Sequence, residues 1–267
     1  MKFIRIFLFI TLLQIVGASF AFGQAAGSIA GQIQDTLGAV VVGAVVVGNA
    51  QAVFHDKDAE LRQVGDFEGV EVSSAIDLQI AQGNENSVAV SAPGDANRAG
   101  IKTEVRKGIL HIWYENKNWF KGSGRKIRAY VSIKTIRLVS ASGACDVVVN
   151  GELNSDELVV KLSGASDFKG AVHAKDLKVD LSGASDVVIK GSTTNLSIDA
   201  SGASHFKGYD LSTDNCRVDA SGATDIKITV NKVLNAEASG ATNIDYMGTG
   251  MIGDLRTSGA SNIRKKS

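Results

Sequence analysis

The sequence contains a single proline, Pro93, among 267 residues, and its 29 glycines follow no three-residue period. Proline-rich linkers and collagen-like structure are therefore excluded. The 28 lysines and arginines balance 28 aspartates and glutamates. The chain thus lacks the basic excess expected of a nucleic-acid-binding protein, and we expect no nucleic-acid partner.

Catalytic motifs are also missing from the sequence. The four histidines share no position in the repeat described below, and there is no Cys–His pair, nucleophile elbow or helical metal-binding motif. We therefore expect a protein that is not an enzyme and that carries no cofactor, calcium being the one exception considered below.

The first 21 residues have the pattern of a secretory signal peptide. Lys2 and Arg5 form a charged start, an apolar run follows from Ile6 to Val16, and Ser19-Phe20-Ala21 is a suitable cleavage site. We therefore expect an exported protein, in the periplasm, on the outer-membrane surface or outside the cell.

Residues 22–60 form a lead, rich in Gly, Ala and Val, that differs from the rest of the chain. Its apolar run from Leu37 to Gly48 has only 12 uninterrupted residues, whereas a spanning helix needs about 20. Glycines within the run further weaken a helix. We interpret 22–60 as a poorly ordered lead; contact of residues 37–54 with a membrane, or self-association, is the alternative.

One short motif, Ser-Gly-Ala, recurs seven times in the second half of the chain. Successive motif serines are 18 to 21 residues apart, which gives a period near 19. Residues before each motif alternate between apolar and polar, as in a strand with one buried face. Helical repeats and propeller blades need about 33 residues or more per unit. The motif serines are Ser142, Ser163, Ser182, Ser201, Ser221, Ser239 and Ser258.

The short period predicts an all-β fold, a parallel β-solenoid whose coils stack on one another. A lone coil cannot offset a backbone entropy cost of about 1–2 kcal/mol per residue, but stacked coils share buried faces and hydrogen bonds. We place the solenoid at residues 61–267, with irregular coils at 61–130 and Ser-Gly-Ala coils at 131–267. Stacking also places Lys161 above Asp180 and Glu237 above Arg256.

The two cysteines, Cys145 and Cys216, occupy different positions of the repeat. At a coil spacing of ~4.8 Å they would lie on the order of 15–20 Å apart. A disulfide needs Cα atoms within about 7 Å. We expect two unpaired, buried thiols that pack as small apolar side chains.

Four features occur together along the chain: Phe67-Glu68-Gly69-Val70-Glu71-Val72, Val88-Ala89-Val90, Gly108-Ile109-Leu110-His111-Ile112 and the serial Ser-Gly-Ala-x-Asp/Asn motifs. As a set they resemble the head GIN domain family of auto-transporter adhesins. The resemblance covers about residues 64–264. It implies a right-handed parallel β-helix, export, and a role in adhesion rather than catalysis. It supplies no catalytic residues.

A row of polar residues follows the motif alanines at a distance of two. Stacked coils would bring these carboxylates about 5 Å apart, a spacing that raises pKa values or attracts a cation. Because calcium prefers several oxygen ligands, Asp146, Asp167, Asp186 and Asp225 are candidate metal ligands. Alternatively, Asp and Asn serve here as turn residues that bond their own backbone. The full row is Asp146, Asp167, Asp186, His205, Asp225, Asn243 and Asn262.

A second candidate site is the segment Trp113–Arg128, which contains both tryptophans of the protein. Aromatic faces with flanking donors suit a glycan or a protein partner. Alternatively, Trp113 packs into the core and Trp119 covers the open end of the coil. The candidate binding residues are Trp113, Tyr114, Trp119, Phe120, Lys121 and Arg125.

These patterns favour an exported, non-enzymatic β-solenoid that contacts a glycan or protein at the cell envelope, as an adhesin or interaction module. One alternative is a glycan-binding module that uses Trp113–Arg128. The other is a carbohydrate-active β-helix in which Asp167 and Asp186 act as acid and base. The oligomeric state is left open.

Overall fold

The computed structural model describes residues 44–46, 53–56, 58–115 and 126–266. The predicted signal peptide and most of the predicted lead lie outside these residues, so both stay predictions. Among the described residues, no helix is both long and apolar enough to cross a membrane.

The described elements are strands, apart from one short helix, α1 (Asp95–Gly100). The first strands are β1 (Ala44–Val46), β2 (Val53–His55), β3 (Ala59–Arg62), β4 (Gly69–Val72), β5 (Ile76–Gln82), β6 (Ser87–Ser91), β7 (Ile101–Arg106), β8 (Ile109–Tyr114) and β9 (Ile127–Ile133). The remaining strands are β10 (Leu138–Ala141), β11 (Asp146–Leu162), β12 (Asp167–Leu181), β13 (Asp186–Ala200), β14 (His205–Ala220), β15 (Asp225–Ala238), β16 (Asn243–Met247), β17 (Met251–Thr257) and β18 (Asn262–Lys265).

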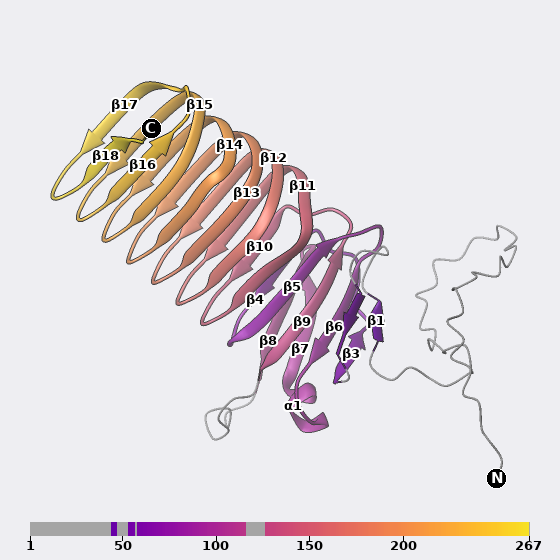
Figure 1. Cartoon of the computed structure of the whole chain (residues 1–267). Coiled ribbons are helices and arrows are strands. Elements are labelled where there is room, and N and C mark those ends of the chain that lie inside the picture. The colour runs from indigo at the N-terminus through magenta and orange to yellow at the C-terminus, as the bar shows by residue number, and fades with distance from the viewer. Residues whose placement is uncertain (1–43, 47–52, 57, 116–125, 267) are drawn as a thin grey trace, which may run out of the picture. The chain divides into compact units, whose positions relative to one another are not determined.

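From β10 onward the strands stack in parallel, and the predicted β-solenoid is confirmed (Figure 1). About seven turns of ~19 residues follow one another along a single axis. β11 to β15 each bend around a coil, with pairing irregularities at some of the bends. Because the residues per turn are nearly constant, the same repeat position lies in one row along the axis.

The N-terminal strands combine parallel and antiparallel pairing. β4 and β8 continue one face of the parallel stack, and β5 and β9 continue another. β3, β6 and β7 add antiparallel pairs, and β1 pairs antiparallel with β2. β3 begins at Ala59, before the predicted start of the solenoid at residue 61, because β6 gives it an antiparallel partner that the repeat does not encode.

The core is built from inward rows of apolar side chains. One row, directly after the acidic position, is at most 1% exposed in six successive coils: Val147, Phe168, Val187, Phe206, Ile226 and Ile244. A second position, two residues later, varies in size from coil to coil: Val149, Gly170, Ile189, Gly208, Ile228 and Tyr246. Glycine stands there wherever phenylalanine fills the first row, so large and small residues alternate and fill the interior.

Each Ser-Gly-Ala motif forms a corner that stacks backbone on backbone. The Gly183 φ angle is +78°, and a Cβ at this position would overlap the carbonyl oxygen of Gly164. The amide of Ala184 donates to that same Gly164 oxygen at 2.7 Å. Glycine is therefore required both by its conformation and by the close approach of the next coil.

The residue after each motif alanine points inward, and the serines at this position donate a hydrogen bond to the carbonyl of their own motif serine. The hydroxyl of Ser185 donates to the Ser182 carbonyl at 3.0 Å, and Ser166 and Ser204 make the same bond one coil away on either side. Cys145 occupies the equivalent position, and its Sγ contacts the Ser142 carbonyl oxygen at 3.2 Å. A buried hydroxyl is tolerated here because it donates a hydrogen bond to the corner carbonyl.

Both cysteines are free and buried, as predicted. Cys216 takes the place of leucine in the inward row that contains Leu177, Leu196 and Leu234. Burial raises the pKa of Cys216 to about 12, so the thiol stays protonated and packs as an apolar group.

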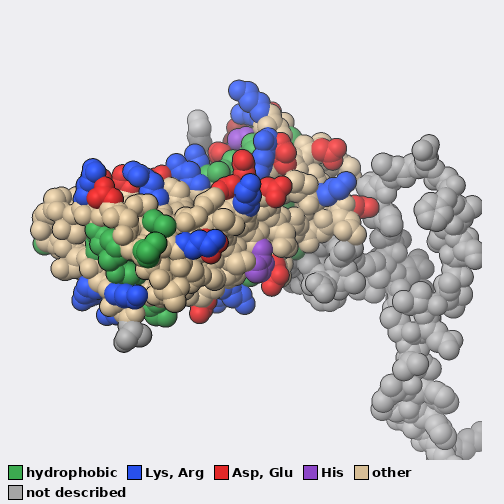
Figure 2. All heavy atoms as spheres, turned by 90° about the horizontal axis from the view of Figure 1, so that it is seen from above, with side chains coloured by type: hydrophobic (Ala, Val, Ile, Leu, Met, Phe, Trp, Pro, Cys, Tyr) green, Lys and Arg blue, Asp and Glu red, His purple; other side chains and the backbone are tan. Residues whose placement is uncertain are grey.

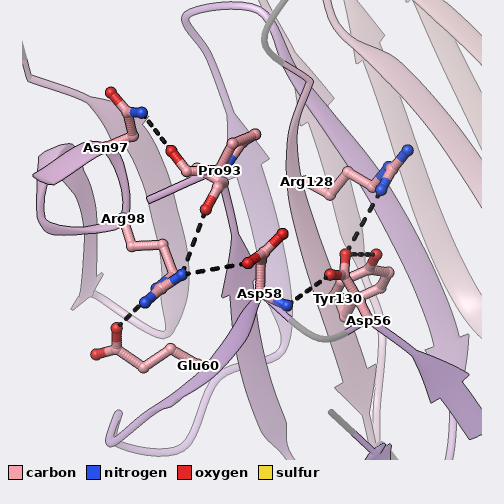
Figure 3. Close-up of polar contacts among 9 residues, drawn as sticks. Asp56, Asp58, Glu60, Pro93, Asn97, Arg98, Arg128 and Tyr130 are labelled. Atoms are coloured by element: carbon pink, nitrogen blue, oxygen red, sulfur yellow. Dashed lines mark hydrogen bonds and ion pairs between the residues drawn. The ribbon is translucent and has the colours of Figure 1, made fainter. Parts of the chain in front are cut away.

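A polar cluster joins the segment around β3 to the solenoid (Figure 3). The Tyr130 hydroxyl donates to Asp56 Oδ2 at 2.6 Å, and Arg128 lies 3.5 Å from the same oxygen. Nearby, Arg98 forms ion pairs with Asp58 at 3.8 Å and Glu60 at 3.7 Å. Burial raises the pKa of Tyr130 to about 12, as do the hydrogen bond to Asp56 and its charge.

We expect the fold to lose stability at high pH, because this cluster is disrupted when Tyr130 ionises. The folded-state pKa of Tyr130 lies above its ordinary value of 10.0. Its stabilising contribution, on the order of 1–2 kcal/mol, is therefore complete below pH 10 and is lost as the pH rises toward 12. Urea unfolding between pH 8 and pH 11.5 should show this loss in the native chain and a flatter profile in Tyr130→Phe. Equal slopes in both proteins would contradict the assignment.

Candidate functional site

The predicted row of polar residues after the corners is continuous in the structure. Parallel register joins Asp146 to Asp167 and Asp186, then to His205, Asp225, Asn243 and Asn262. We call these residues, together with Asp77, the first acidic row. Asp77 belongs because the pairing of Val147 with Leu78 places it beside Asp146.

Asp77 is absent from the predicted row because its motif is degenerate. Ser73-Ser74-Ala75-Ile76-Asp77 forms the same corner one coil earlier, with Ser74 in the place of glycine at φ 67°. The amide of Ser142 donates to the Val72 carbonyl at 3.0 Å, as the amide of Ser163 does to Ala141. A search for Ser-x-Ala-x-Asp would have found this eighth corner.

Charges in the first acidic row are unevenly balanced. Burial raises the pKa of Asp167, and the charges of Asp186 and Asp146 raise it further. Asp186, in contrast, lies 2.7 Å from His205 Nδ1 and 3.6 Å from Lys207 Nζ. Lys207 therefore supplies a cation at the centre of the row, and repulsion is concentrated toward Asp77, whose pKa is raised by burial and by Asp146.

The calcium site proposed for Asp146, Asp167, Asp186 and Asp225 stays a prediction. Within the described part of the chain, no group of three or more His, Cys, Asp or Glu side chains is arranged to hold a metal ion. The four carboxylates lie along one row, and His205 separates Asp225 from the other three.

A second acidic row lies on the other side of the corners. Asp180, Asp199, Asp219 and Glu237 stand two residues before successive motif serines and are register partners. Lys178 Nζ lies 3.0 Å from Asp199 and 3.1 Å from Asp180. The hydrogen bond to Asp199 contributes most to raising the pKa of Lys178, and the bond to Asp180 raises it further.

The ends of this second acidic row agree only in part with the predicted charge pairs. Lys161 Nζ lies 3.5 Å from Asp180 Oδ2, as the stacking suggested. Arg256 is the register partner of Glu237, but its ion pair is with Asp254, at 2.8 Å. The continuous acids between the two ends were not predicted, although their constant offset from the motif serine was visible in the sequence.

Between the second acidic row and the corners runs a groove with a volume of about 530 Å³. We call it the serine groove, because the motif serines form one of its sides. Each coil adds a hydroxyl and a charged side chain at the coil spacing of ~4.8 Å. The lining includes Lys161, Asp180, Asp199, Asp219, Ser163, Ser182, Ser201 and Ser221. Such a lining can donate and accept hydrogen bonds along an extended ligand.

The structure describes only part of the predicted aromatic site. Trp113 and Tyr114 lie at the end of β8, whereas Trp119, Phe120, Lys121 and Arg125 lie outside the described residues. The Arg106 guanidinium lies 5.9 Å from the centroid of the Trp113 ring, a cation–π distance. Tyr114 packs against the core beside Gly100. Of the predicted binding residues, the two that the structure describes, Trp113 and Tyr114, therefore contact other parts of the protein.

Comparison with known proteins identifies the family. The family model described as "Putative auto-transporter adhesin, head GIN domain" matches residues 66–250. The chain belongs to the head GIN domain family. This match begins close to β4 and includes six of the seven Ser-Gly-Ala corners of the head GIN domain. No functionally curated protein matches the chain.

Solved structures share the fold of this head GIN domain at low sequence identity. A "putative adhesin" from Bacteroides fragilis is 19% identical, with a TM-score of 0.71, over 78% of this chain and 96% of its own. A "Putative lipid binding protein" from Parabacteroides distasonis is 17% identical, with a TM-score of 0.58, over 83% and 99%. A "putative adhesin" from Parabacteroides merdae is 16% identical, with a TM-score of 0.57, over the same shares.

Proposed function

We propose that this head GIN domain protein is an exported, non-enzymatic adhesion module that binds a glycan or protein of the cell envelope through the serine groove. The observation that carries the proposal is the groove itself, in which hydroxyls and charged groups recur on successive coils. A repeated array suits an extended ligand, because each coil offers similar donors and acceptors in register. The adhesin description of the family and the N-terminal export pattern support the same function.

The test is binding of the purified chain to an array of glycans and extracellular-matrix proteins, with calcium and with chelator. We expect a ligand whose binding is lost when Asp180→Asn and Asp199→Asn are combined. The matched control combines Asp176→Asn and Asp210→Asn, which makes the same charge change outside the serine groove. Equal loss in both variants, or no ligand under either condition, would contradict the proposal.

The array also tests the calcium proposal for the first acidic row. Binding that requires calcium and is lost in Asp146→Asn with Asp167→Asn, but not in the serine-groove variant, would place the ligand on the first acidic row. Carboxylate oxygens are the ligands that calcium prefers. Binding that is equal with calcium and with chelator would contradict a calcium role.

Trp113 carries a second candidate function, glycan binding by the aromatic segment. It is supported by the Trp113 ring, which is partly exposed on β8 and lies over Arg106. Binding of a glycan at this site should be lost in the Trp113→Ala variant and retained in the serine-groove variant. The opposite pattern assigns the ligand to the serine groove.

The same experiment also tests the carbohydrate-active alternative. This alternative is supported by the different environments of Asp167 and Asp186. Asp167 has a raised pKa, while Asp186 lies 2.7 Å from His205 Nδ1 and forms an ion pair with Lys207. An acid and a base on neighbouring carboxylates need such a difference. Release of sugar ends from any bound polysaccharide, abolished by Asp167→Asn, would overturn the non-enzymatic assignment.

A further inference from the structure

The last coil of the solenoid has hydrogen-bonded neighbours on one side only. β17 pairs with β15, and β18 pairs with β16. No other described strand pairs with β17 or β18. Their outer edges carry backbone donors and acceptors that no described strand pairs, which favours pairing with another strand. The edge of β17 has a register shift between Ile252 and Leu255, where the Asp254 amide donates to Asn235 Oδ1 at 2.9 Å.

Apolar side chains accompany this open edge. Met251 is 72% exposed and Ile252 is 51% exposed, whereas Leu234, the register partner of Ile252 one coil earlier, is 1% exposed. Figure 2 shows hydrophobic side chains gathered at the end of the solenoid that carries the C-terminus in Figure 1. The inward row that contains Leu234 thus continues into the last coil at Ile252, where no described element covers it, and Met251 adds an exposed apolar side chain beside it.

The opposite end of the solenoid is built differently. There β7 pairs antiparallel with β8, and β6 pairs antiparallel with both β9 and β3. A second copy could not extend the parallel ladder from head to tail, because its N-terminal end offers antiparallel strands rather than an equivalent coil. Two C-terminal ends can meet, however, since a two-fold axis brings β17 of each copy side by side and antiparallel.

The charges on β17 are self-complementary in that arrangement. With Leu255 on the two-fold axis, Asp254 of one copy lies opposite Arg256 of the second copy, and the reverse pair forms at the same time. Asp254 and Arg256 are exposed and already lie 2.8 Å apart within one chain. Opposite charges in directly facing antiparallel positions stabilise a pair of strands, and like charges destabilise it.

We propose that the C-terminal end of the solenoid, formed by β17 and β18, is a self-association surface that binds a second copy of this chain tail to tail. The contact joins the outer edges of β17, covers Met251 and Ile252, and sets Asp254 against Arg256 across the two-fold axis. Because two-fold symmetry closes after two copies, the contact gives dimers rather than fibres.

The test is the mass of the purified full chain by sedimentation velocity, at concentrations from about 1 µM to about 200 µM to span micromolar affinities. We expect a concentration-dependent dimer. Arg256→Asp should weaken it about tenfold or more, because each Asp254 then faces an aspartate. The double variant Asp254→Arg with Arg256→Asp should restore it, since both the internal and the facing pairs reform. Ile252→Lys should also weaken the dimer.

Val188→Lys is the matched control, because Val188 is 41% exposed on the flank of the solenoid, away from the last coil. This variant should retain the native dimer affinity. Thermal unfolding checks that every variant is folded. A monomer at all concentrations would overturn the proposal, as would mass that grows without limit. A dimer that is insensitive to Arg256→Asp, or one lost only when residues 22–43 are removed, would place the contact elsewhere and also overturn it.

Discussion

Gly183→Ala is expected to lower the free energy of unfolding by about 2–5 kcal/mol. A left-handed backbone costs a non-glycine residue about 1–2 kcal/mol, and overpacking against a rigid neighbour adds about 1–3 kcal/mol. Here the neighbour is the carbonyl oxygen of Gly164, which cannot move without losing its bond to Ala184. Chemical unfolding followed by circular dichroism would measure the loss.

Two other glycines separate the contributions to that loss. Gly151 has a φ of +87° with nothing within 4 Å of its added Cβ, so Gly151→Ala reports the conformational cost alone. Gly65 has open space and no positive φ, so Gly65→Ala should be close to neutral. Equal effects at Gly183 and Gly151 would show that the stacked approach of the corners contributes nothing.

Gly208→Ile should be at least as damaging, and a second substitution should rescue it. A Cβ at Gly208 would overlap the Phe206 ring, so the isoleucine has no space in a close-packed interior. Phe206 is fully buried, and Phe206→Val alone should cost about 2–4 kcal/mol through the cavity it leaves. The double variant reproduces the Val187-x-Ile189 pattern of the preceding coil.

We expect the double variant Phe206→Val with Gly208→Ile to be more stable than either single variant. The interaction energy from a double-mutant cycle should be favourable by about 2 kcal/mol or more. Additive effects of the two changes would mean that the inward rows do not share one space. The comparison is made by urea unfolding of the four proteins under the same conditions.

Much of the solenoid could be predicted because its information repeats. A constant distance between corners fixes the register of every coil, so the inward rows and the unpaired cysteines follow from spacing alone. The second acidic row was equally visible, since Asp180, Asp199, Asp219 and Glu237 keep a constant offset from the motif serines. The charge pairs at its two ends are the stronger signal, because a row of like charges resembles the polar face of any half-buried strand.

The N-terminal strands could not be derived in the same way. β3, β6 and β7 pair antiparallel, and no periodic spacing encodes that choice. Ser74 adopts a positive φ of 67° where every later corner uses glycine, so the eighth corner has a weaker sequence signal. The serine groove also depends on how side chains on two sides of a corner face each other, which a linear pattern does not specify.

The direction of the hydrogen bonds between coils has a mechanical consequence. These bonds lie along the solenoid axis, so tension between the two ends loads them one coil after another, starting at β18, rather than shearing them together. Each coil of ~19 residues that peels away lengthens the chain by about 60 Å, from an initial rise of ~4.8 Å. A molecule tethered at both ends would therefore lengthen in steps and dissipate mechanical energy, instead of unfolding completely at a single threshold force.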